Sequence, residues 1–381
     1  MKIGFFSTDF SSQPIVDKEK SAINHRTEFV KDKTQLAFGG TFWYRGGMPA
    51  TELMKHDYEC VIAWRFRQLQ DGTISVLDVA GNWHDDCDVI WQQRWMHRDA
   101  AEQFKRARAV GQYVISDLDD NFWKLSKTNI AHETTDAKNN PDFNRDHYRN
   151  GLAASSAITV STPSLGKEIE HLGVPVYLCR NMIDIERWPQ LDPTSDGMIG
   201  WVGGVQWRSH DLEQLRTNRI PEFLEAWGLP FYHGGDSNVP GVRKAYEIAG
   251  IDKTRVQCTV APLVSIQEYP RLWEPVNVSL IPLEDVPFNR GKSSLKALES
   301  SACGIPYIAS DHPEQRWFTE HGGMGRLARN TKPQQWLDHL TDLLDPIVRK
   351  EEGQANREHA EQFDIRDNWS QWADVFNEVV A

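Results

Sequence analysis

The stretch PFNRGKSSLKALESSACGIPYIAS, from Pro287 to Ser310, decides how the rest of the chain is interpreted. Its composition predicts a turn, a helix from about Lys292, a second turn at a glycine and an apolar strand. The first N–H groups of a helix bind anions, and Gly291 and Lys292 stand at that start. Glu299 lies further along the same face, where a carboxylate can accept hydrogen bonds from a vicinal diol. The pattern suits a ligand with a phosphate at one end and hydroxyls at the other, but also an ordinary capped surface helix.

The bulk composition is that of a globular protein with more than one domain. The chain has 381 residues, of which 40% are hydrophobic and 25% charged. No apolar run approaches the ~20 residues that span a bilayer, and MKIGFFSTDF predicts a first strand rather than a signal peptide. Five singly placed cysteines favour reduced thiols in a cytoplasm over disulfides or a zinc site. The net charge of -12 counts against a protein that holds DNA mainly through phosphate contacts.

Two successive α/β patterns run along the chain. Strand-like runs alternate with helical segments, which predicts parallel sheets. We therefore predict two Rossmann-like, doubly wound domains, residues 1–190 and 198–350, joined by the Pro- and Asp-rich segment 189–197. Residues 351–381 are expected to form a helical tail that packs back on the first domain.

Ligands of doubly wound sheets bind beyond the carboxyl ends of the strands. The polar residues and glycines that directly follow predicted strands are therefore the site candidates. They are Gly39-Gly40, Gln93-Arg94, Asp117 to Asp120, Gly203-Gly204, Gly234-Gly235 and Phe288 to Ser294.

The segment SSLKALESSACGIPYIAS resembles the signature of family-four glycosyltransferases, which have the GT-B fold of two Rossmann-like domains facing across a cleft. Glu299 matches the second glutamate of that family's Glu-x7-Glu motif, which the resemblance implies holds the nucleotide ribose. Gly291 stands where the family has its first glutamate, the implied contact of the donor sugar. Either the sugar pocket differs here, or Lys292 and the backbone around it take over that contact. The residues meant are Asn289, Arg290, Gly291, Ser293 and Ser294.

The segment IGWVGGVQWRSHDLEQL resembles the strand, loop and helix that open the nucleotide domain of these enzymes. The resemblance implies that Gly203, Gly204 and Arg208 bind the donor diphosphate, while the family's second basic residue has no obvious match. The motifs taken together resemble divergent glycosyltransferases, many of them encoded by bacteriophages.

The acceptor is expected on the first domain. GGTFWYRGGMPATEL resembles the glycine loop of that domain, which implies roles for Gly39, Gly40 and Arg45. Arg94 and Asp120, which follow later strands, are placed on the same side.

The acidic run SDLDDNF follows a buried strand. Asp117 is expected to face the cleft and contact the donor sugar or the acceptor, and Asp119 to orient an acceptor hydroxyl or act as a base. A helix-capping acidic turn is the alternative. An Asp-x-Asp pair binds metal in the other major glycosyltransferase fold, but that fold has one nucleotide domain and does not explain residues 198–310, so no essential metal or other cofactor is expected. His97 is a candidate for proton transfer, or a structural histidine.

The resemblance implies an enzyme that transfers a hexosyl or pentosyl group from a nucleotide sugar, such as a UDP-sugar, with retention of configuration. Lys292 and the helix start would stabilise the leaving diphosphate. A sugar-nucleotide epimerase, a phosphorylase and a non-catalytic nucleotide- or sugar-binding protein stay open as alternatives. A modified DNA base, a protein, a glycan and a small molecule stay open as acceptors. The expected location is cytoplasmic, in the host if a bacteriophage encodes the chain.

Overall fold

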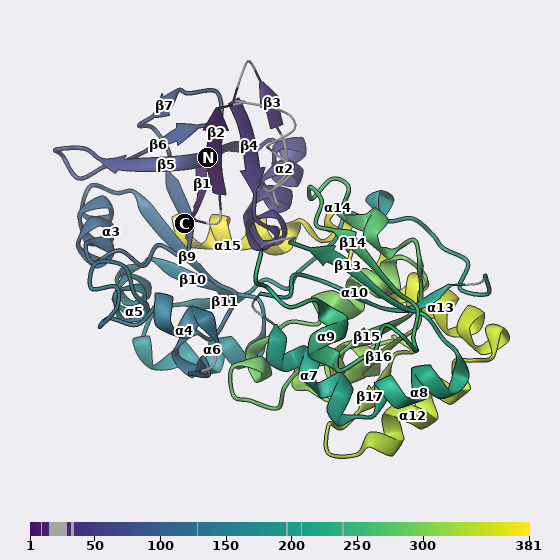
Figure 1. The fold of residues 1–381 in the computed structure, drawn as a ribbon. Helices are drawn as coiled ribbons and strands as arrows, with labels where there is room; N and C mark the ends of the chain where they lie inside the picture. Colours follow the sequence, from purple (N-terminus) through teal and green to yellow (C-terminus); the bar gives the residue numbers. More distant parts are fainter. Residues whose placement is uncertain are drawn as a thin grey trace. The chain divides into compact units, whose positions relative to one another are not determined.

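The computed structural model divides the chain into two compact units, coloured along the sequence in Figure 1. The N-terminal unit is Met1–Met182 with Ile365–Ala381, and the C-terminal unit is Ile183–Asp364. The described residues are 1–8, 10–14, 29–31, 34–127, 129–195, 197–206, 208–237 and 240–381.

The division falls after Met182, not at the predicted linker 189–197. Hydrogen bonds hold that segment within the C-terminal unit: Leu191 N donates to Cys303 O (2.9 Å), and Arg349 Nε donates to Pro193 O (2.7 Å). A Pro- and Asp-rich composition marks an irregular segment, but such a segment can still be bonded into one unit.

The N-terminal unit is built on an eight-stranded sheet with the order β11-β10-β9-β8-β1-β5-β6-β7. The pairs from β11 to β5 are parallel, whereas β6 and β7 are antiparallel to their neighbours. The strands are β1 (Lys2–Ser7), β5 (Glu59–Gln68), β6 (Ile74–Asp78), β7 (Trp83–His84), β8 (Val89–Gln93), β9 (Tyr113–Leu118), β10 (Ala157–Val160) and β11 (Val176–Leu178). A separate antiparallel sheet has the order β2-β4-β3, with β2 (Phe10–Pro14), β3 (Phe29–Lys31) and β4 (Thr34–Phe38).

The helices of the N-terminal unit include the pair α3 and α5, which lie side by side. The unit contains α1 (Gly40–Phe42), the π-helix η2 (Trp43–Gly47), α2 (Met48–Leu53), η3 (Met54–His56), α3 (Ala100–Ala109), η4 (Phe122–Lys124), α4 (Ile130–Thr134), α5 (Arg145–Ala154), α6 (Pro163–Ile169), η5 (Glu170–Leu172), α14 (Ile365–Asn368) and α15 (Ser370–Val380). No helix in the described part of the chain is long and apolar enough to cross a membrane.

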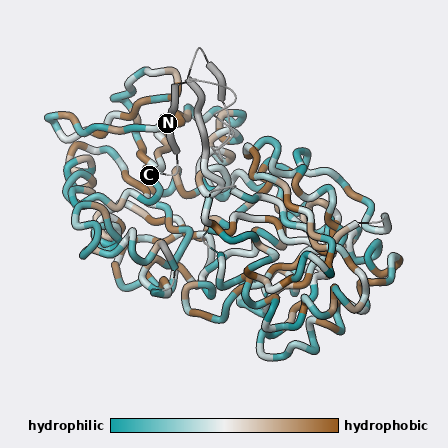
Figure 2. The backbone as a smooth tube through the Cα atoms, in the orientation of Figure 1, coloured by the Kyte–Doolittle hydropathy of each residue, from teal (hydrophilic) through white to brown (hydrophobic). Residues whose placement is uncertain are grey.

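The central strands of this unit are buried along their whole length. All residues of β8 are buried, as are all but the first of β1 and β9. Near-continuous apolar runs of this kind are typical of parallel strands covered on both faces. Figure 2 shows the contrast with α3, whose backbone tube is mostly hydrophilic.

The C-terminal unit is built on a six-stranded, wholly parallel sheet with the order β14-β13-β12-β15-β16-β17. Its strands are β12 (Met198–Val202), β13 (Phe231–Asp236), β14 (Cys258–Pro262), β15 (Val276–Ile281), β16 (Tyr307–Ser310) and β17 (Arg326–Ala328). Its helices are η6 (Ile185–Arg187), α7 (Ser209–Thr217), α8 (Ile220–Trp227), α9 (Ala245–Ala249), η7 (Tyr269–Trp273), η8 (Asn289–Gly291), α10 (Leu295–Ala302), α11 (Pro313–Glu320), α12 (Pro333–Asp342) and α13 (Pro346–Glu361).

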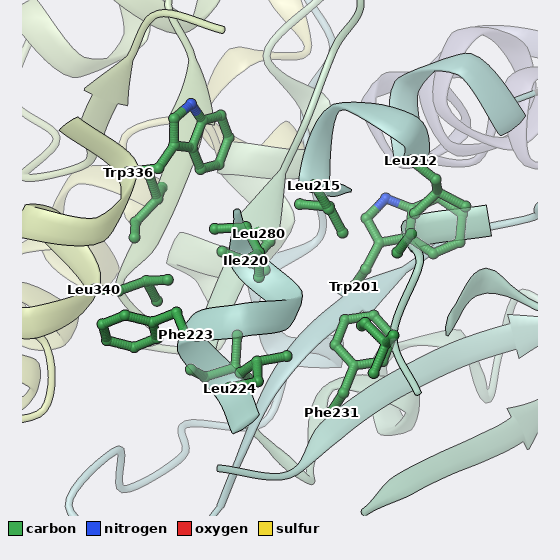
Figure 3. Packing of buried hydrophobic residues seen from close by; sticks show 14 of the residues in the cluster. Trp201, Leu212, Leu215, Ile220, Phe223, Leu224, Phe231, Leu280, Trp336 and Leu340 are labelled. Atoms are coloured by element: carbon green, nitrogen blue, oxygen red, sulfur yellow. The ribbon is translucent and has the colours of Figure 1, made fainter. Parts of the chain in front are cut away.

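One hydrophobic core ties these strands to the helices around them (Figure 3). Trp201 of β12 and Leu280 of β15 belong to the same buried cluster as Ile220 of α8 and Trp336 of α12. Fully burying a large apolar side chain contributes about 1.5–3 kcal/mol. The core therefore fixes where β12 and β15 end, and with them the loops that follow.

Residues 351–381, which were predicted to form one tail, are divided between the units. Residues up to Asp364 stay in the C-terminal unit, where α13 packs against α10. Helix α15 belongs to the N-terminal unit, where Phe376 meets Phe5 edge to face (ring centroids 5.7 Å apart) and Trp372 meets Trp91 (6.2 Å).

Candidate functional site

The glycine pair after β12 meets the glycine pair Gly234-Gly235, which lies within β13 near its carboxyl end. Gly203 N donates to Gly234 O (2.8 Å), and Gly203 O accepts from His233 Nε2 (3.0 Å). At Gly235, where φ is +103°, a Cβ would lie 3.1 Å from Gly203 O, so a side chain there would be both strained and crowded. Among the described residues, none beyond its chain neighbours has an atom within 4 Å of a Cβ placed at Gly204. The turn after β12 is therefore anchored on one side, at Gly203.

The helix of the opening motif starts later than its sequence predicts. Residues 289–291 form a single 3-10 turn, closed by Lys292 N donating to Asn289 O (3.1 Å), and Lys292 itself is extended (φ −70°, ψ 138°). Ser294 flanks the start, and α10 runs from Leu295 to Ala302. The prediction of a helix from Lys292 is therefore wrong by three residues, and the first-turn N–H groups belong to residues 295–297.

Lys292 and Asn289 both donate hydrogen bonds to one buried carboxylate. Asp211, in the first turn of α7, accepts from Lys292 Nζ (3.1 Å), Asn289 Nδ2 (2.7 Å) and Glu284 N (2.8 Å). The side chains of Asp211 and Lys292 are 6% and 13% exposed. Asp211 was not predicted. The sequence offered only one signal for it, an acidic residue in the first turn of a helix.

The second predicted carboxylate, Glu299, is also buried and has partners within the C-terminal unit. Tyr269 Oη donates to Glu299 Oε2 (3.0 Å), Lys296 Nζ lies 2.7 Å from the same oxygen, and Lys296 Nζ also donates to Tyr269 Oη. We call Tyr269, Lys296 and Glu299 the α10 triad. Glu299 is 1% exposed and Lys296 19%. Neither Lys296 nor Tyr269 was predicted, although Lys and Glu three residues apart on a helix commonly pair.

Arg208 adds a second cation beside this triad. Its side chain has no hydrogen bond or ion pair with any residue that the structure describes, but its charge acts on Lys296 and Tyr269. Burial lowers the pKa of Lys296, and Arg208 lowers it further, while Glu299 opposes both. Arg208 and Lys296 give two positive charges against one negative charge on Glu299. An anionic ligand would relieve the repulsion between the two cations.

The remaining donor-side predictions fall on the same segment with different surroundings. The Arg290 side chain is 60% exposed and pairs with Asp285 (3.2 Å), so only its backbone belongs to the turn. Gly291 is buried in the 3-10 turn. The carbonyl of Ser293 accepts a long hydrogen bond from Gln315 (3.5 Å).

In the N-terminal unit, Asp117 is fully buried. Its carboxylate is 0% exposed and pairs with Arg45, which is 1% exposed, at 2.6 Å. Gln93 Nε2 (3.0 Å) and Thr159 Oγ1 (2.8 Å) also donate to it. The prediction that Asp117 faces the cleft is corrected to an internal ion pair, and its partner Arg45, predicted on the acceptor side, is buried with it.

Three predicted residues do come together where β8 and β9 end. Arg94 Nη2 contacts a carboxylate oxygen of Asp119 and lies 3.2 Å from Asp120. Arg94 has φ +59°, a left-handed conformation that a non-glycine residue rarely adopts. The side chains of Arg94, Asp119 and Asp120 are 23%, 9% and 28% exposed. This Arg94–Asp119–Asp120 group is therefore partly open to solvent.

His97 and the first glycine pair, Gly39-Gly40, have contacts different from those of the Arg94–Asp119–Asp120 group. His97 stacks on Trp95 (5.4 Å between centroids), and its Nδ1 accepts from Asp99 N (3.2 Å). Gly39 O accepts from Trp43 N (3.0 Å), and no atom of the described residues beyond its chain neighbours lies within 4 Å of a Cβ placed at Gly40. Further along the same segment, Gly46 is crowded: a Cβ there would lie 2.5 Å from Phe42 and 2.8 Å from Trp91.

Comparisons with known proteins agree with the two parallel sheets. No model of a known protein family matches the chain. A curated D-inositol 3-phosphate glycosyltransferase from Thermobispora bispora is 33% identical over 96 residues, which is 25% of this chain and only 22% of the relative.

Several solved structures are similar over nearly the whole chain. Sucrose-phosphate synthase from Thermosynechococcus elongatus has a TM-score of 0.65 at 12% identity and covers 99% of this chain and 98% of its own. An alpha-glucosyltransferase in complex with UDP and a 13-mer DNA has a TM-score of 0.60 at 11% identity, covering 100% and 99%. Anabaena HepE in complex with UDP-glucose has a TM-score of 0.57 at 13% identity, covering 99% and 100%. The predicted GT-B fold is therefore confirmed. The bacteriophage origin has no support among these proteins.

Proposed function

We propose that the chain is a glycosyltransferase that moves a sugar from a nucleotide sugar to an acceptor hydroxyl. The observation that carries the proposal is the buried Lys296–Glu299 pair of α10 in a GT-B fold, with the charge of Arg208 acting on Lys296. The weak relative is a glycosyltransferase, and solved neighbours bind UDP and UDP-glucose. A UDP-sugar is therefore the proposed donor.

The proposed reaction breaks the bond between the sugar's anomeric carbon and the β-phosphate oxygen, which keeps the electron pair. A new bond forms between that carbon and the acceptor oxygen, which loses its proton. Negative charge grows on the departing diphosphate. Arg208, Lys296 and the N–H groups at the start of α10 are the fixed donors that would stabilise this charge.

We further propose that this chemistry needs no metal ion and retains the anomeric configuration. The candidate carboxylates for a metal, Asp119 and Asp120, already face the guanidinium of Arg94, with which a cation would have to compete. Retention rests on the resemblance of residues 293–310 to family-four glycosyltransferases.

The Arg94–Asp119–Asp120 group is the proposed acceptor contact, because it is the partly exposed polar group at the carboxyl ends of β8 and β9. Asp119 is the proposed base or orienting group for the acceptor hydroxyl. A glycan, a protein, a small molecule and a modified DNA base remain as acceptors, and the net charge of -12 disfavours the last. The scattered cysteines favour a cytoplasmic location, as the sequence predicted.

The test is a panel of nucleotide sugars incubated with the protein, with and without candidate acceptors, followed by mass spectrometry of nucleotides and sugars. Acceptor-dependent release of nucleoside diphosphate supports the proposal. Release of nucleotide with an altered free sugar and no acceptor indicates an epimerase. A sugar 1-phosphate product indicates a phosphorylase. Tight binding without turnover indicates a binding protein.

A matched pair of variants ties the activity to the site. Arg208→Ala should lower turnover at least about 100-fold, as loss of one transition-state donor does. Arg255→Ala removes an arginine that is 62% exposed in an ion pair with Glu225 and should leave turnover unchanged. Equal activity in the two variants would argue against the α10 site.

A further inference from the structure

The carboxylate proposed to hold the ribose is already bonded to two side chains of its own unit. Glu299 Oε2 receives Tyr269 Oη at 3.0 Å and Lys296 Nζ at 2.7 Å, and Glu299 is only 1% exposed. A ribose hydroxyl that bonds to this oxygen has to take the place of one of these donors. Lys296 is the donor that can leave, because its four-carbon stem is flexible.

Tyr269 is held more firmly than Lys296. Tyr269 lies on η7, and its ring packs edge to face against Trp188, with the ring centroids 6.2 Å apart. Lys296 Nζ lies 4.8 Å from the centre of the Tyr269 ring. Tyr269 is therefore a fixed contact for the Lys296 ammonium.

We propose that the Lys296–Glu299 ion pair closes the donor site when no nucleotide is bound, and that a nucleoside diphosphate opens it by drawing Lys296 onto its diphosphate. This inference rests on the proposed function, and it adds a competition within the α10 triad. The ribose hydroxyls then replace the ammonium on Glu299. Lys296 thereby supplies the second cation that the loop after β12 lacks.

The charges around Lys296 favour this exchange. Arg208 and Lys296 repel each other, and Glu299 offsets this repulsion at Lys296. A diphosphate brings further negative charge, so both cations gain a partner, while Glu299 keeps hydrogen-bond donors from the ribose. A nucleoside without phosphates has no negative group to pair with Lys296. Its ribose has to break the Lys296–Glu299 ion pair without giving the ammonium a new anionic partner. Occupation of the diphosphate position should therefore help a ribose to bind.

The first experiment uses the unmodified protein. Calorimetric titration with uridine is performed alone and in saturating inorganic pyrophosphate. The proposal predicts that pyrophosphate strengthens uridine binding about five-fold or more, because coupling between sites of 1–3 kcal/mol corresponds to that range. Uridine binding that pyrophosphate weakens or leaves unchanged overturns the proposal.

The second experiment uses Lys296→Met, with Lys350→Met on the exposed face of α13 as the matched control. Lys296→Met should weaken UDP binding about 10-fold or more, because a charge-assisted contact is lost. It should strengthen uridine binding, because Glu299 no longer holds an ammonium. A lysine with a purely structural role would lower both affinities together, and that result, like no change in either, contradicts the proposal.

The outcomes separate this inference from the proposed function. If the unmodified protein binds neither UDP nor uridine, that result contradicts both the UDP-sugar donor and the proposed opening of the Lys296–Glu299 ion pair, which we call the switch. If it binds UDP and transfers sugar, but Lys296→Met shifts UDP and uridine in the same direction, only the switch falls. Should Lys296→Met not fold, the pyrophosphate titration still decides.

Discussion

At the scale of single residues, the Arg45–Asp117 pair shows how burial separates a structural charge from a reactive one. Burial raises the pKa of Asp117, and Arg45 offsets part of that effect. Arg45 is further bonded to Asn181 Oδ1 (3.2 Å) and lies 4.9 Å from the Trp372 ring centre. The pair therefore joins η2, β9 and α15 inside the N-terminal unit.

Breaking this pair on one side should destabilise the protein strongly. Asp117→Asn leaves a buried guanidinium without its counter-ion, a change that costs about 3–5 kcal/mol. Urea unfolding measures the loss. Asp142→Asn, in an ion pair with Arg98 in which both side chains are 60% exposed, should cost under about 1 kcal/mol. Similar losses in the two variants would contradict the structural role of Asp117.

The sequence predicted a buried strand here, but Asp117 lies within β9 rather than after it, and its surroundings were not predicted. Alternation along a strand tells which face a side chain takes, whereas burial at the strand's end depends on what covers it. Here the cover comes from Arg45 and Thr159, far away in the sequence. Glu299 shows the same limit, because its partner Tyr269 lies on another element.

At the scale of elements, the loop that precedes α10 depends on a residue of α7. Asp211 accepts hydrogen bonds from Glu284 N, Asn289 Nδ2 and Lys292 Nζ, and so joins the start of α7 to the chain after β15. Because all three donors converge on one carboxylate, this loop should hold its shape before any ligand binds.

A double-mutant cycle between Asp211 and Lys292 tests that link. Lys292→Ala should lower the free energy of unfolding by about 1–3 kcal/mol, since a buried carboxylate loses a charged donor. In the Asp211→Ala background the same change should cost much less. Additive effects in urea unfolding would show that the two side chains are not coupled.

Most elements followed from local pattern. The first strand, β1, was predicted from MKIGFFSTDF, the buried strand at the acidic run is β9, and the apolar run that ends at Ser310 is β16. The short β17 was missed, because Arg326–Ala328 carries no distinctive pattern and is a strand only by pairing with β16. Helix α5 was missed for a different reason: its polar first turn, capped by Asn144, extends the polar sequence before it.

At the scale of the whole molecule, we expect three buried histidines to make the C-terminal unit less stable in acid. Burial lowers the pKa of His233, His312 and His359. The neutral form is thus favoured in the folded state, and the unfolded state binds more protons below the ordinary pKa of about 6.5. Their contribution to stability is present above that pH and is lost as the pH falls through the folded values.

Unfolding free energies measured between pH 7.5 and 5.5 should therefore decrease toward the acid end. His359→Gln should flatten this slope, because one buried site no longer takes up a proton on unfolding. His171→Gln changes an exposed histidine of the N-terminal unit and should leave the slope unchanged. A slope that both substitutions leave intact would assign the acid sensitivity to other groups.

The path of the chain makes the N-terminal unit depend on residues from the other end of the sequence. The chain leaves this unit at Met182 and returns at Ile365. The linker was predicted at 189–197 because a composition rich in Pro and Asp marks irregular segments. The division between units instead depends on which contacts form. The return of α15 follows from its apolar face, which Trp372 and Phe376 bury against Trp91 and Phe5.

Removing the Trp372 side chain should therefore weaken the N-terminal unit in particular. Trp372→Ala opens a cavity beside Trp91 and Arg45 and should cost about 3–5 kcal/mol. Hydrogen exchange should accelerate in β1, β8 and β9 and change little in β12 and β15. Asp374→Ala, on the exposed face of the same helix, should leave exchange in all five strands unchanged. Faster exchange in β12 and β15 alone would mean that α15 supports the C-terminal unit instead, and that the chain's return is not what stabilises the first sheet.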